Sequence, residues 1–417
     1  MLGQFAIKLN WHIIRYRRLI NPMITKRSYI TEFIGLDLLR FFLSVAIVLR
    51  HYYYHFYSSI SGGPPNASIG PELPFYNVLR FFYDRGQLAV EMFWLISGLI
   101  FYSIYHEEIT HKKISFANFS FLRFTRLYPL HFLTLLIVAV IQLFFFQRYH
   151  VYYIYQANDL THFLLQLLFM GSWRPTIDYS FNTPVWSVSV EIFVYIVFYL
   201  ITFSGLTKGK GLTCIILITV LLNLFKILLP FNECLLFFFF GCLLARLIQS
   251  GIPLKSLLAR YILVSIAFVV LSRLVRNVTM VDSNIFNPGT LFMLKLIPMG
   301  SSVVLLFVIV FRSVTSRFFI SFFKNLGNMT YSLYLVHFPI QMIIFLILRP
   351  SSPKVFNSPG ILILFLGTSI LVGWIVFEYF EKPVQQYLRT KFNQLTIRKE
   401  QLTEPGHQSN VTIEGKV

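Results

Sequence analysis

The feature that most constrains this chain is a series of apolar runs, each roughly the length of one membrane-crossing helix, that recurs along nearly all of it. The composition agrees, because 56% of the 417 residues are hydrophobic and only 13% are charged. We therefore predict an all-α, polytopic membrane protein of about ten transmembrane helices. The expected spans are residues 36–57, 87–105, 128–147, 184–204, 212–229, 232–249, 258–275, 289–311, 328–348 and 360–379.

Lysine and arginine predict the orientation of these spans. Most of the 36 Lys and Arg lie in alternate short segments, starting before the first span and ending after the last. By the positive-inside rule those segments are cytoplasmic, so both termini are expected inside the cell. The same rule accounts for the net charge of +19. The expected partner is therefore the lipid bilayer and not a nucleic acid, and no metal site is predicted.

Three regions are expected along the chain. Residues 1–33 form a basic, amphipathic cytoplasmic segment. Residues 34–386 form the transmembrane domain. Residues 387–417 form a polar cytoplasmic tail, and the low hydrophobicity after about residue 385 predicts disorder. Pro383 is expected to stop the last helix. Residues 160–171 are apolar but too short to cross, which favours a re-entrant or interfacial segment.

The first span carries two ionisable residues, Arg40 and His51. Eleven residues are close to three helical turns, so both side chains are expected on one face, separated by about 16–17 Å along the axis. Charge inside hydrocarbon is costly, and ionisable residues there usually face a cavity and mark function. A packed, hydrogen-bonded histidine without function is the alternative.

Two acids are expected at the same outer depth as His51. Glu91 lies near the outer start of the second span, and Glu191 near the outer start of the fourth. A histidine with two carboxylates in one layer predicts a catalytic base with orienting partners. For Glu91, a structural ion pair with Arg85 is the alternative.

Further polar residues suggest a cavity. Arg123 and Arg126, one helical turn apart at the inner side, suit a polyanionic phosphate, although simple positive-inside anchoring is the alternative. The remaining candidates for an acceptor site or cavity wall are Trp186, Ser187, Ser189, Tyr334 and His337. For the last two, helix packing through polar groups is the alternative.

Taken in order, these motifs resemble the acyltransferase-3 family of integral-membrane O-acyltransferases over about residues 34–386, in its stand-alone form without a soluble C-terminal domain. Trp94 replaces a second Phe of the family pattern. Two further positions also depart from that pattern. Arg50 precedes His51 where an apolar or aromatic residue is usual, and Ile192 replaces a second Glu. The matching residues are Arg40 and His51; Gly86, Val90, Glu91, Phe93, Ser97 and Gly98; Arg123, Arg126, Tyr128 and Pro129; Trp186, Ser187, Ser189 and Glu191; Thr330, Tyr331, Ser332, Tyr334 and His337; and Glu381 and Pro383.

The resemblance implies transfer of an acyl group, commonly acetyl, from cytoplasmic acyl-CoA to a hydroxyl of a lipid-linked or cell-surface glycan. His51 is then the expected general base, or alternatively a transient acyl carrier, and Glu91 and Glu191 orient it. Arg40, Arg123 and Arg126 are expected to hold the donor. The expected location is a bacterial inner (plasma) membrane.

Two rival classes remain at this stage. A transporter or flippase would use the same buried charges as a relay, and it predicts Gly- or Pro-broken helices in paired halves, which are not apparent. A scaffolding membrane protein would leave the buried acids and histidine without a purpose. Release of free CoA from acetyl-CoA separates the enzyme from both.

Overall fold

The computed structural model of the chain describes residues 34–61, 67–174, 179–225, 227, 231–278, 288–348 and 352–403. These residues form helices and loops and contain no β-strand, which confirms the all-α prediction. The predicted amphipathic segment 1–33 lies outside the described residues, as does the end of the polar tail after residue 403. The α-helices are α4 (Ile34–Ser61), α5 (Tyr76–Arg85), α6 (Leu88–Thr110), α7 (Phe116–Tyr149), α8 (Leu160–Leu167), α9 (Trp186–Phe203), α10 (Gly211–Leu224), α11 (Asn232–Gln249), α12 (Leu254–Val278), α13 (Pro288–Phe311), α14 (Arg317–Asn328), α15 (Thr330–Leu348), α16 (Pro359–Val376) and α17 (Lys382–Thr403).

Among the described residues, eight helical segments are long and apolar enough to cross a membrane, and they correspond to eight of the ten predicted spans. The other two spans are α4 and α10. α4 has 28 residues, enough to cross, but it carries several charges. α10 is apolar but only 14 residues long. The eight segments are Leu88–Thr110, Phe116–Tyr149, Thr183–Phe203, Asn232–Gln249, Leu254–Leu271, Phe292–Phe311, Thr330–Leu348 and Pro359–Leu395.

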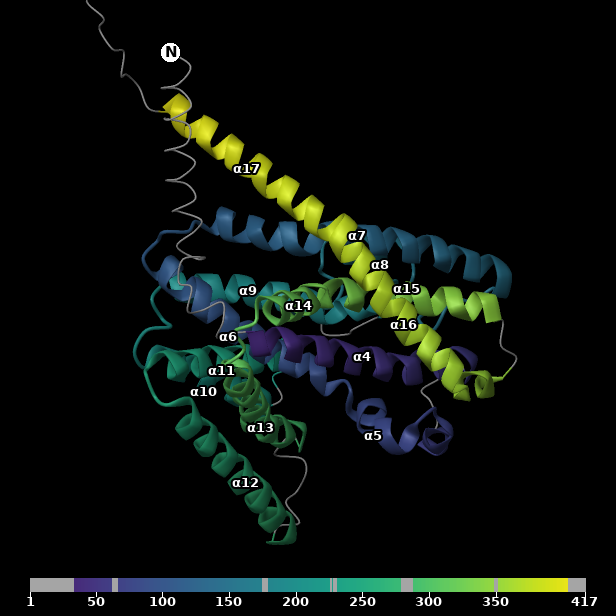
Figure 1. Cartoon of the computed structure of the whole chain (residues 1–417), viewed down its shortest axis with the longest axis horizontal. Coiled ribbons are helices and arrows are strands. Elements are labelled where there is room, and N and C mark those ends of the chain that lie inside the picture. Colours follow the sequence, from purple (N-terminus) through teal and green to yellow (C-terminus); the bar gives the residue numbers. More distant parts are fainter. Residues whose placement is uncertain are drawn as a thin grey trace, which may run out of the picture.

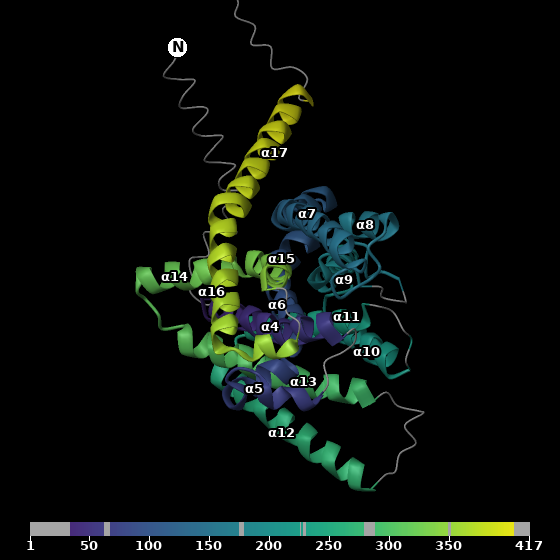
Figure 2. The same ribbon diagram turned by 90° about the vertical axis from the view of Figure 1, so that its right-hand side faces the viewer.

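α4 lies at the centre of the bundle. It packs against α5, α6, α13, α14 and α15 (Figures 1 and 2). Its buried residues are mainly apolar, yet its polar side chains also face protein and not lipid, since Ser44 and His55 are buried. We call the end of the bundle where α4 begins the inner end, as the lysine and arginine distribution predicts.

The closest helix pair is α6 with α11, and two glycines allow it. A Cβ added to Gly98 would lie 1.8 Å from the Phe238 carbonyl oxygen, and one added to Gly241 would lie 2.0 Å from the Leu95 carbonyl oxygen. Small residues let backbones approach where helix association depends on close packing. The face of α6 that includes Leu95 and Gly98 therefore packs on α11. Only a different face of α6 is available to line a functional site.

The last helix does not end at Pro383, contrary to the expectation from the sequence. A π-turn over Phe377–Glu381 joins α16 to α17, and the helix continues to Thr403 (Figure 1). The expectation of disorder after about residue 385 is therefore wrong for residues up to 403. Pro383 is the second residue of α17, and the preceding turn already departs from α-helical hydrogen bonding, so the missing N–H is tolerated there.

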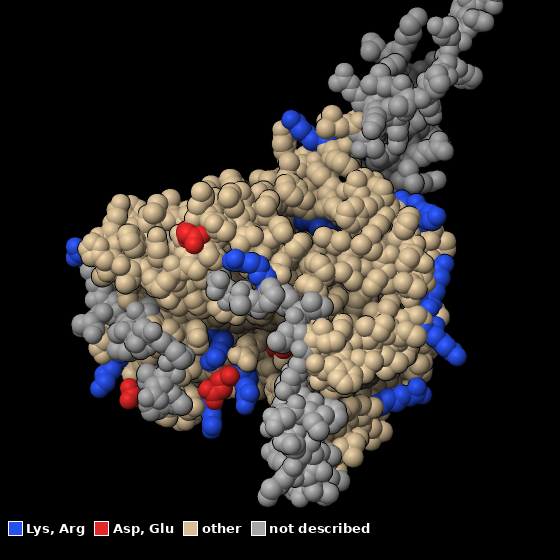
Figure 3. Space-filling model, turned by 180° about the vertical axis from the view of Figure 1, so that it is seen from behind, with Lys and Arg blue, Asp and Glu red and all other residues tan. Residues whose placement is uncertain are grey.

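The surface fits a lipid environment. Large apolar side chains are exposed along α7 and α12, for example Phe144 at 60% and Leu263 at 65%. Figure 3 shows Lys and Arg in a row along one edge of the molecule, next to broad uncharged surface. α8 has only eight residues and cannot cross, in agreement with the expectation for residues 160–171.

Candidate functional site

A cavity of about 380 Å³ opens between α4, α6, α7, α9, α15 and α17. Its volume falls within the range of small-molecule sites, roughly 300–1,000 Å³. The face of α6 that lines it carries Val90, Trp94, Ser97 and Phe101, spaced at helical intervals. The other face of α6, which includes Leu95 and Gly98 and packs on α11, does not line the cavity.

Four arginines line the inner part of this cavity. Three of them, Arg40, Arg123 and Arg126, are the predicted donor-binding residues, and the structure brings them together. The fourth is Arg389 of α17. Arg40 lies near the start of α4, and Arg123 and Arg126 lie near the start of α7, so all four belong to the inner end.

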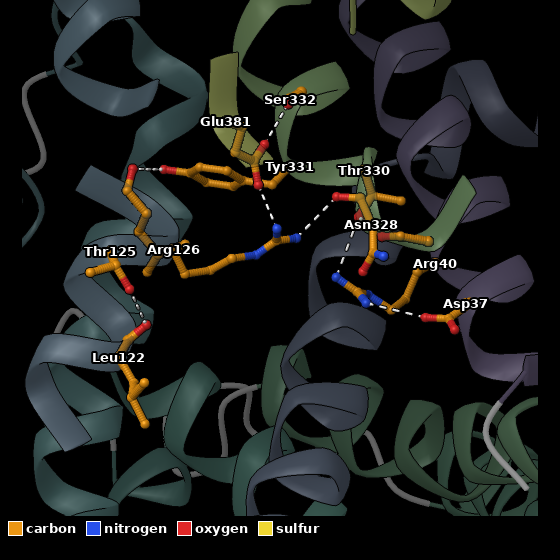
Figure 4. A network of polar contacts seen from close by, with 12 residues as sticks. Asp37, Arg40, Leu122, Thr125, Arg126, Asn328, Thr330, Tyr331, Ser332 and Glu381 are labelled. Carbon is orange, nitrogen blue, oxygen red and sulfur yellow. Dashed lines mark hydrogen bonds and ion pairs between the residues drawn. The ribbon is translucent and has the colours of Figure 1, made fainter. Parts of the chain in front are cut away.

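Arg126 is held by the π-turn. Its Nη1 donates to Glu381 Oε1 at 2.5 Å, and its Nη2 donates to the Asn328 carbonyl oxygen at 3.0 Å (Figure 4). The other Glu381 carboxylate oxygen accepts from the Ser332 hydroxyl. Glu381 is 3% exposed and Arg126 is partly buried. Their ion pair links α7 to the π-turn, and the contacts with Asn328 and Ser332 add the end of α14 and α15.

Arg40 is held from its own helix and from α15. Its Nη1 lies 3.6 Å from Asp37 Oδ1, and its Nη2 donates to the Thr330 hydroxyl at 3.4 Å (Figure 4). Gly327, at the end of α14, packs directly on Asp37, because an added Cβ would lie 2.5 Å from that side chain. The pair Asp37–Arg40 is therefore positioned by α14 and α15.

Arg123 and Arg389 have no hydrogen-bonded carboxylate partner among the described residues. Arg123 Nη2 donates to the Tyr105 hydroxyl at 2.6 Å, and its guanidinium lies over the Phe101 ring at 5.0 Å. Arg389 Nε donates to the Thr125 hydroxyl at 3.2 Å. The hydrogen bonds of these two cations go only to neutral groups, and Arg123 in addition interacts electrostatically with the carboxyl group of Glu191.

The walls above the arginines are polar. The carboxyl group of Glu191 lies near the hydroxyls of Ser97 and Tyr195, and all three residues line the cavity. The hydroxyls of Ser187 and Tyr334, which also line it, lie 2.9 Å apart. The structure therefore places Glu191, Ser187 and Tyr334 in one cavity with the predicted donor-binding arginines.

Trp186 and Ser189 lie outside the lining. Trp186 packs edge-to-face on the lining residue Trp94, with ring centroids 5.9 Å apart. Ser189 instead anchors the segment after α8, since its hydroxyl donates to the Phe169 carbonyl oxygen at 2.5 Å and accepts from the Ser172 N–H at 3.3 Å. The geometry thus gives Trp186 a supporting role and gives Ser189 a structural one.

His51 and His337 form a pair just beyond the deepest part of the cavity. His51 Nδ1 lies 2.7 Å from His337 Nε2. His51 is one turn past the lining residue Ile47, and His337 is three residues past the lining residue Tyr334. The ring centroids of Tyr334 and His337 are 5.9 Å apart, so the histidine pair adjoins the cavity without lining it.

The hydrogen bonds fix the tautomer of a neutral pair. His337 Nδ1 lies 3.3 Å from the Leu333 carbonyl oxygen, which can only accept, so Nδ1 carries the hydrogen. Nε2 of His337 then accepts from Nδ1–H of His51. The lone pair of His51 is left on Nε2, the atom that a general base would use.

A second histidine supports His51 from the same helix. His55 stacks on His51 with centroids 4.5 Å apart and an interplanar angle of 16°. Gln341 joins the layer to α15, since its Nε2 donates to the His51 carbonyl oxygen at 3.0 Å and its Oε1 accepts from His55 Nδ1 at 3.2 Å. We call His51, His55, His337 and Gln341 the histidine layer.

Glu91 is not brought to His51. It follows the lining residue Val90 but lies on the α6 face of Leu95 and Gly98, which packs on α11. It is 8% exposed, and its Oε2 has no hydrogen-bond partner among the described residues. The prediction used depth in the membrane alone and did not use the angular position around the helix, which is what separates Glu91 from the cavity.

The outer side of the histidine layer is aromatic. The rings of His55 and Tyr155 have centroids 6.1 Å apart, and those of Tyr155 and Tyr179 are 5.4 Å apart. Burial raises the pKa of the Tyr155 hydroxyl above its usual range, so this loop residue stays neutral. Arg50 donates to the Tyr83 carbonyl oxygen of α5 at 2.8 Å and lies over the Tyr54 ring at 5.4 Å.

Sequence reasoning missed Arg389, His55 and Gln341. His55 had a usable signal, because it follows His51 by four residues on a helix. Arg389 and Gln341 had none, because only the tertiary fold brings α17 and α15 to the cavity and the histidine layer.

Together these features define a multi-pass helical membrane protein whose bundle encloses a basic, polar cavity. A family profile described as an acyltransferase domain, Acyl_transf_3, matches residues 33–378. The chain belongs to the acyltransferase-3 family.

The comparison with curated proteins gives a partial match. The chain is similar to the acyltransferase MdmB of Streptomyces mycarofaciens, with 32% identity over 123 residues. That segment covers 27% of this chain and 27% of MdmB, so most of the relative's length is not matched. No solved structure matches the chain.

Proposed function

We propose that this protein is a membrane O-acyltransferase that moves an acyl group, acetyl in the simplest case, from cytoplasmic acyl-CoA to a hydroxyl of a lipid-linked or cell-surface glycan. The observation that carries the proposal is the order of groups along one cavity. Arginines occupy its inner part, and its deepest lining residues lie next to the His51–His337 pair.

The inner arginines suit the donor. Acyl-CoA carries several phosphate charges at one end and the thioester at the other, and guanidinium groups bind phosphate oxygens with charge-assisted hydrogen bonds. Arg40, Arg123 and Arg126 line the part of the cavity that would receive the phosphate-bearing end. The thioester would then point toward Tyr334 and the histidine layer.

The histidine layer suits the chemistry. Nε2 of His51 would take the proton from the acceptor hydroxyl, and the alkoxide oxygen would form a bond to the thioester carbonyl carbon. Collapse of the tetrahedral intermediate breaks the C–S bond, and the proton held on His51 passes to the CoA thiolate. Nδ1–H of His51 stays bonded to His337 throughout, so the charge that develops on His51 is stabilised by a neutral imidazole.

The two acids receive different parts in this proposal. Glu191 lines the cavity beside Ser97 and Tyr195, where it would shape the polar wall and balance the arginine charge. Glu91 receives no catalytic part, because its helix face packs on α11.

The acceptor side of the proposal rests on the outer aromatic residues and on the resemblance to glycan O-acyltransferases. Tyr155 and Tyr179 form a ring-to-ring contact leading toward His55 and hence toward His51. Aromatic rings with hydroxyl groups offer a sugar both an apolar face and hydrogen bonds. A bacterial inner (plasma) membrane is the proposed location, since it has acyl-CoA on one side and surface glycans on the other.

The test uses the full chain, purified in detergent or reconstituted in vesicles, with acetyl-CoA as donor and release of free thiol as readout. The enzyme releases CoA faster when a membrane glycan extract is added, and acetyl groups appear on that glycan by mass spectrometry. A transporter or flippase moves a solute and releases no CoA. Surface glycans from cells with and without the gene then identify the acceptor.

A further inference from the structure

The four arginines that line the inner part of the cavity, which we call its inner mouth, differ in whether they form ion pairs. Arg40 is paired with Asp37, and Arg126 is paired with Glu381. Arg123 and Arg389 form hydrogen bonds only with neutral groups among the described residues. Nε of Arg123 is also buried without a hydrogen-bond partner among them. Glu191 interacts electrostatically with Arg123, but no carboxylate among the described residues contacts Arg389. The four arginines therefore outnumber the three acids near them, Asp37, Glu191 and Glu381, and this excess of positive charge favours an anionic ligand.

Arg389 is held in place by contacts on both sides of it along α17. On one side, Glu381 is fixed by Arg126 and Ser332. On the other, Phe392 stacks on Phe121 of α7 with ring centroids 4.0 Å apart. Arg389 lies between these contacts and reaches α7 through its hydrogen bond to Thr125. The side chain is therefore positioned and is not a freely moving surface cation.

The region that supplies Arg389 lies beyond the family match, which ends at residue 378. Arg389 also lies beyond Pro383, the last residue that matches the family pattern, so the evidence for its role comes from the geometry alone. Gln385, one turn before Arg389, lines the same cavity. Two successive turns of α17 thus form one wall of the mouth.

We propose, resting on the donor assignment above, that Arg389 and Arg123 bind the 3′-phosphate of CoA at the inner mouth. That phosphate is at the adenosine end of CoA, far from the thioester. A donor whose thioester reaches toward Tyr334 and the histidine layer leaves this end at the cavity entrance, between α7 and α17. α17 then completes the donor site and sets its preference for CoA over donors that lack the 3′-phosphate.

The experiment compares CoA with 3′-dephospho-CoA, using equilibrium binding to the full chain in detergent. Wild-type protein is expected to bind CoA about 10-fold more tightly or better, as for a charge-assisted hydrogen bond. Arg389→Gln should reduce that ratio several-fold, by weakening CoA binding and leaving 3′-dephospho-CoA binding unchanged, while Arg123 keeps the rest of the phosphate contact. Arg389→Lys, which keeps the charge, should retain more of the ratio than Arg389→Gln.

The matched control is Lys391→Gln. Lys391 is an exposed cation on the same helix, with its Nζ over the Tyr387 ring at 5.1 Å, and it does not line the cavity. Its substitution removes the same charge and should leave the ratio at the wild-type value. Melting temperatures of all variants show whether the fold is kept.

The outcomes separate this proposal from the proposed function. If Arg389→Gln keeps the wild-type ratio, or weakens both ligands equally, the 3′-phosphate assignment is wrong and Arg389 is structural. If wild-type protein binds both ligands equally, the assignment is also wrong, while CoA remains the donor. If wild-type protein binds neither, the donor assignment itself fails.

Discussion

The inner mouth of the cavity and the histidine layer differ in the groups that they present and in what those groups can do. The mouth presents four guanidiniums, of which two are paired with carboxylates and two are not. The histidine layer consists of three imidazoles and an amide, linked in an order that leaves one lone pair on His51 Nε2 when the imidazoles are neutral. Uncancelled charge attracts and orients a polyanion, whereas a neutral, ordered chain holds a proton at one atom.

Because of this difference, substitutions in the two regions should change different kinetic parameters. Substitutions at the mouth should raise the donor concentration needed for half-maximal rate, because they remove binding energy that is the same in the ground state and the transition state. Damage to the histidine layer should lower the maximal rate. The predictions below run from the largest expected effect to the smallest.

His51→Ala removes the proposed base. We expect the rate of acyl transfer to fall by about 100- to 10,000-fold, the range typical of a general base, with CoA affinity unchanged because the mouth is intact. Thiol release from acetyl-CoA in the presence of acceptor gives the rate, and equilibrium binding gives the affinity. Near-normal transfer by a folded variant would remove His51 from the chemistry.

Glu381→Ala leaves Arg126 half-buried without its carboxylate. Removing one partner of a buried ion pair costs about 3–5 kcal/mol, so we expect a clear fall in the thermal stability of the protein in detergent. The double variant Glu381→Leu with Arg126→Leu should recover most of the loss, because apolar replacement of a whole buried pair is often neutral. A double variant as unstable as the single one would mean that the charges are not what links α7 to the π-turn.

His337→Phe keeps a ring but removes the acceptor for His51 Nδ1–H. Because that hydrogen bond becomes charge-assisted when His51 takes a proton, we expect the maximal rate to fall by about 10- to 100-fold. The KM for acetyl-CoA should stay near the wild-type value. His337→Gln can still accept through its amide oxygen and should be more active than the Phe variant; equal loss in both would point to packing alone.

Glu378→Gln is the smallest of the four changes. Glu378 pairs with Lys382 at 2.5 Å, but its side chain is 34% exposed and that of Lys382 is 41% exposed. A pair so open to solvent contributes about 0–1 kcal/mol, so stability and activity should hardly change. The variant is a control for Glu381, since both acids lie in the same π-turn. A loss as large as that of Glu381→Ala would show that the turn tolerates no substitution at all.

Hydropathy was enough to predict the helical class and the order of most spans, because both follow from the length and spacing of the apolar runs. Arg40, Arg123 and Arg126 were predicted to act together, and they do share a cavity.

Angular position and long-range packing could not be predicted in the same way. Glu91 and Val90 have the same depth, yet only Val90 faces the cavity, because the choice depends on Gly98 and Gly241 bringing α6 onto α11. Ser189 was predicted to line the cavity from its place in the motif, but its hydroxyl forms a hydrogen bond with the segment after α8. The role of α17 depends on a π-turn, which no local sequence signal indicated here.

The most direct test of the whole account is the donor saturation curve of two variants measured side by side. Arg123→Gln should need about 10-fold or more acetyl-CoA to reach half its maximum, yet approach the wild-type maximal rate. His51→Ala should stay flat at every donor concentration. If both variants lower the plateau and leave the half-saturating concentration unchanged, the division between a binding mouth and a reactive histidine layer is wrong.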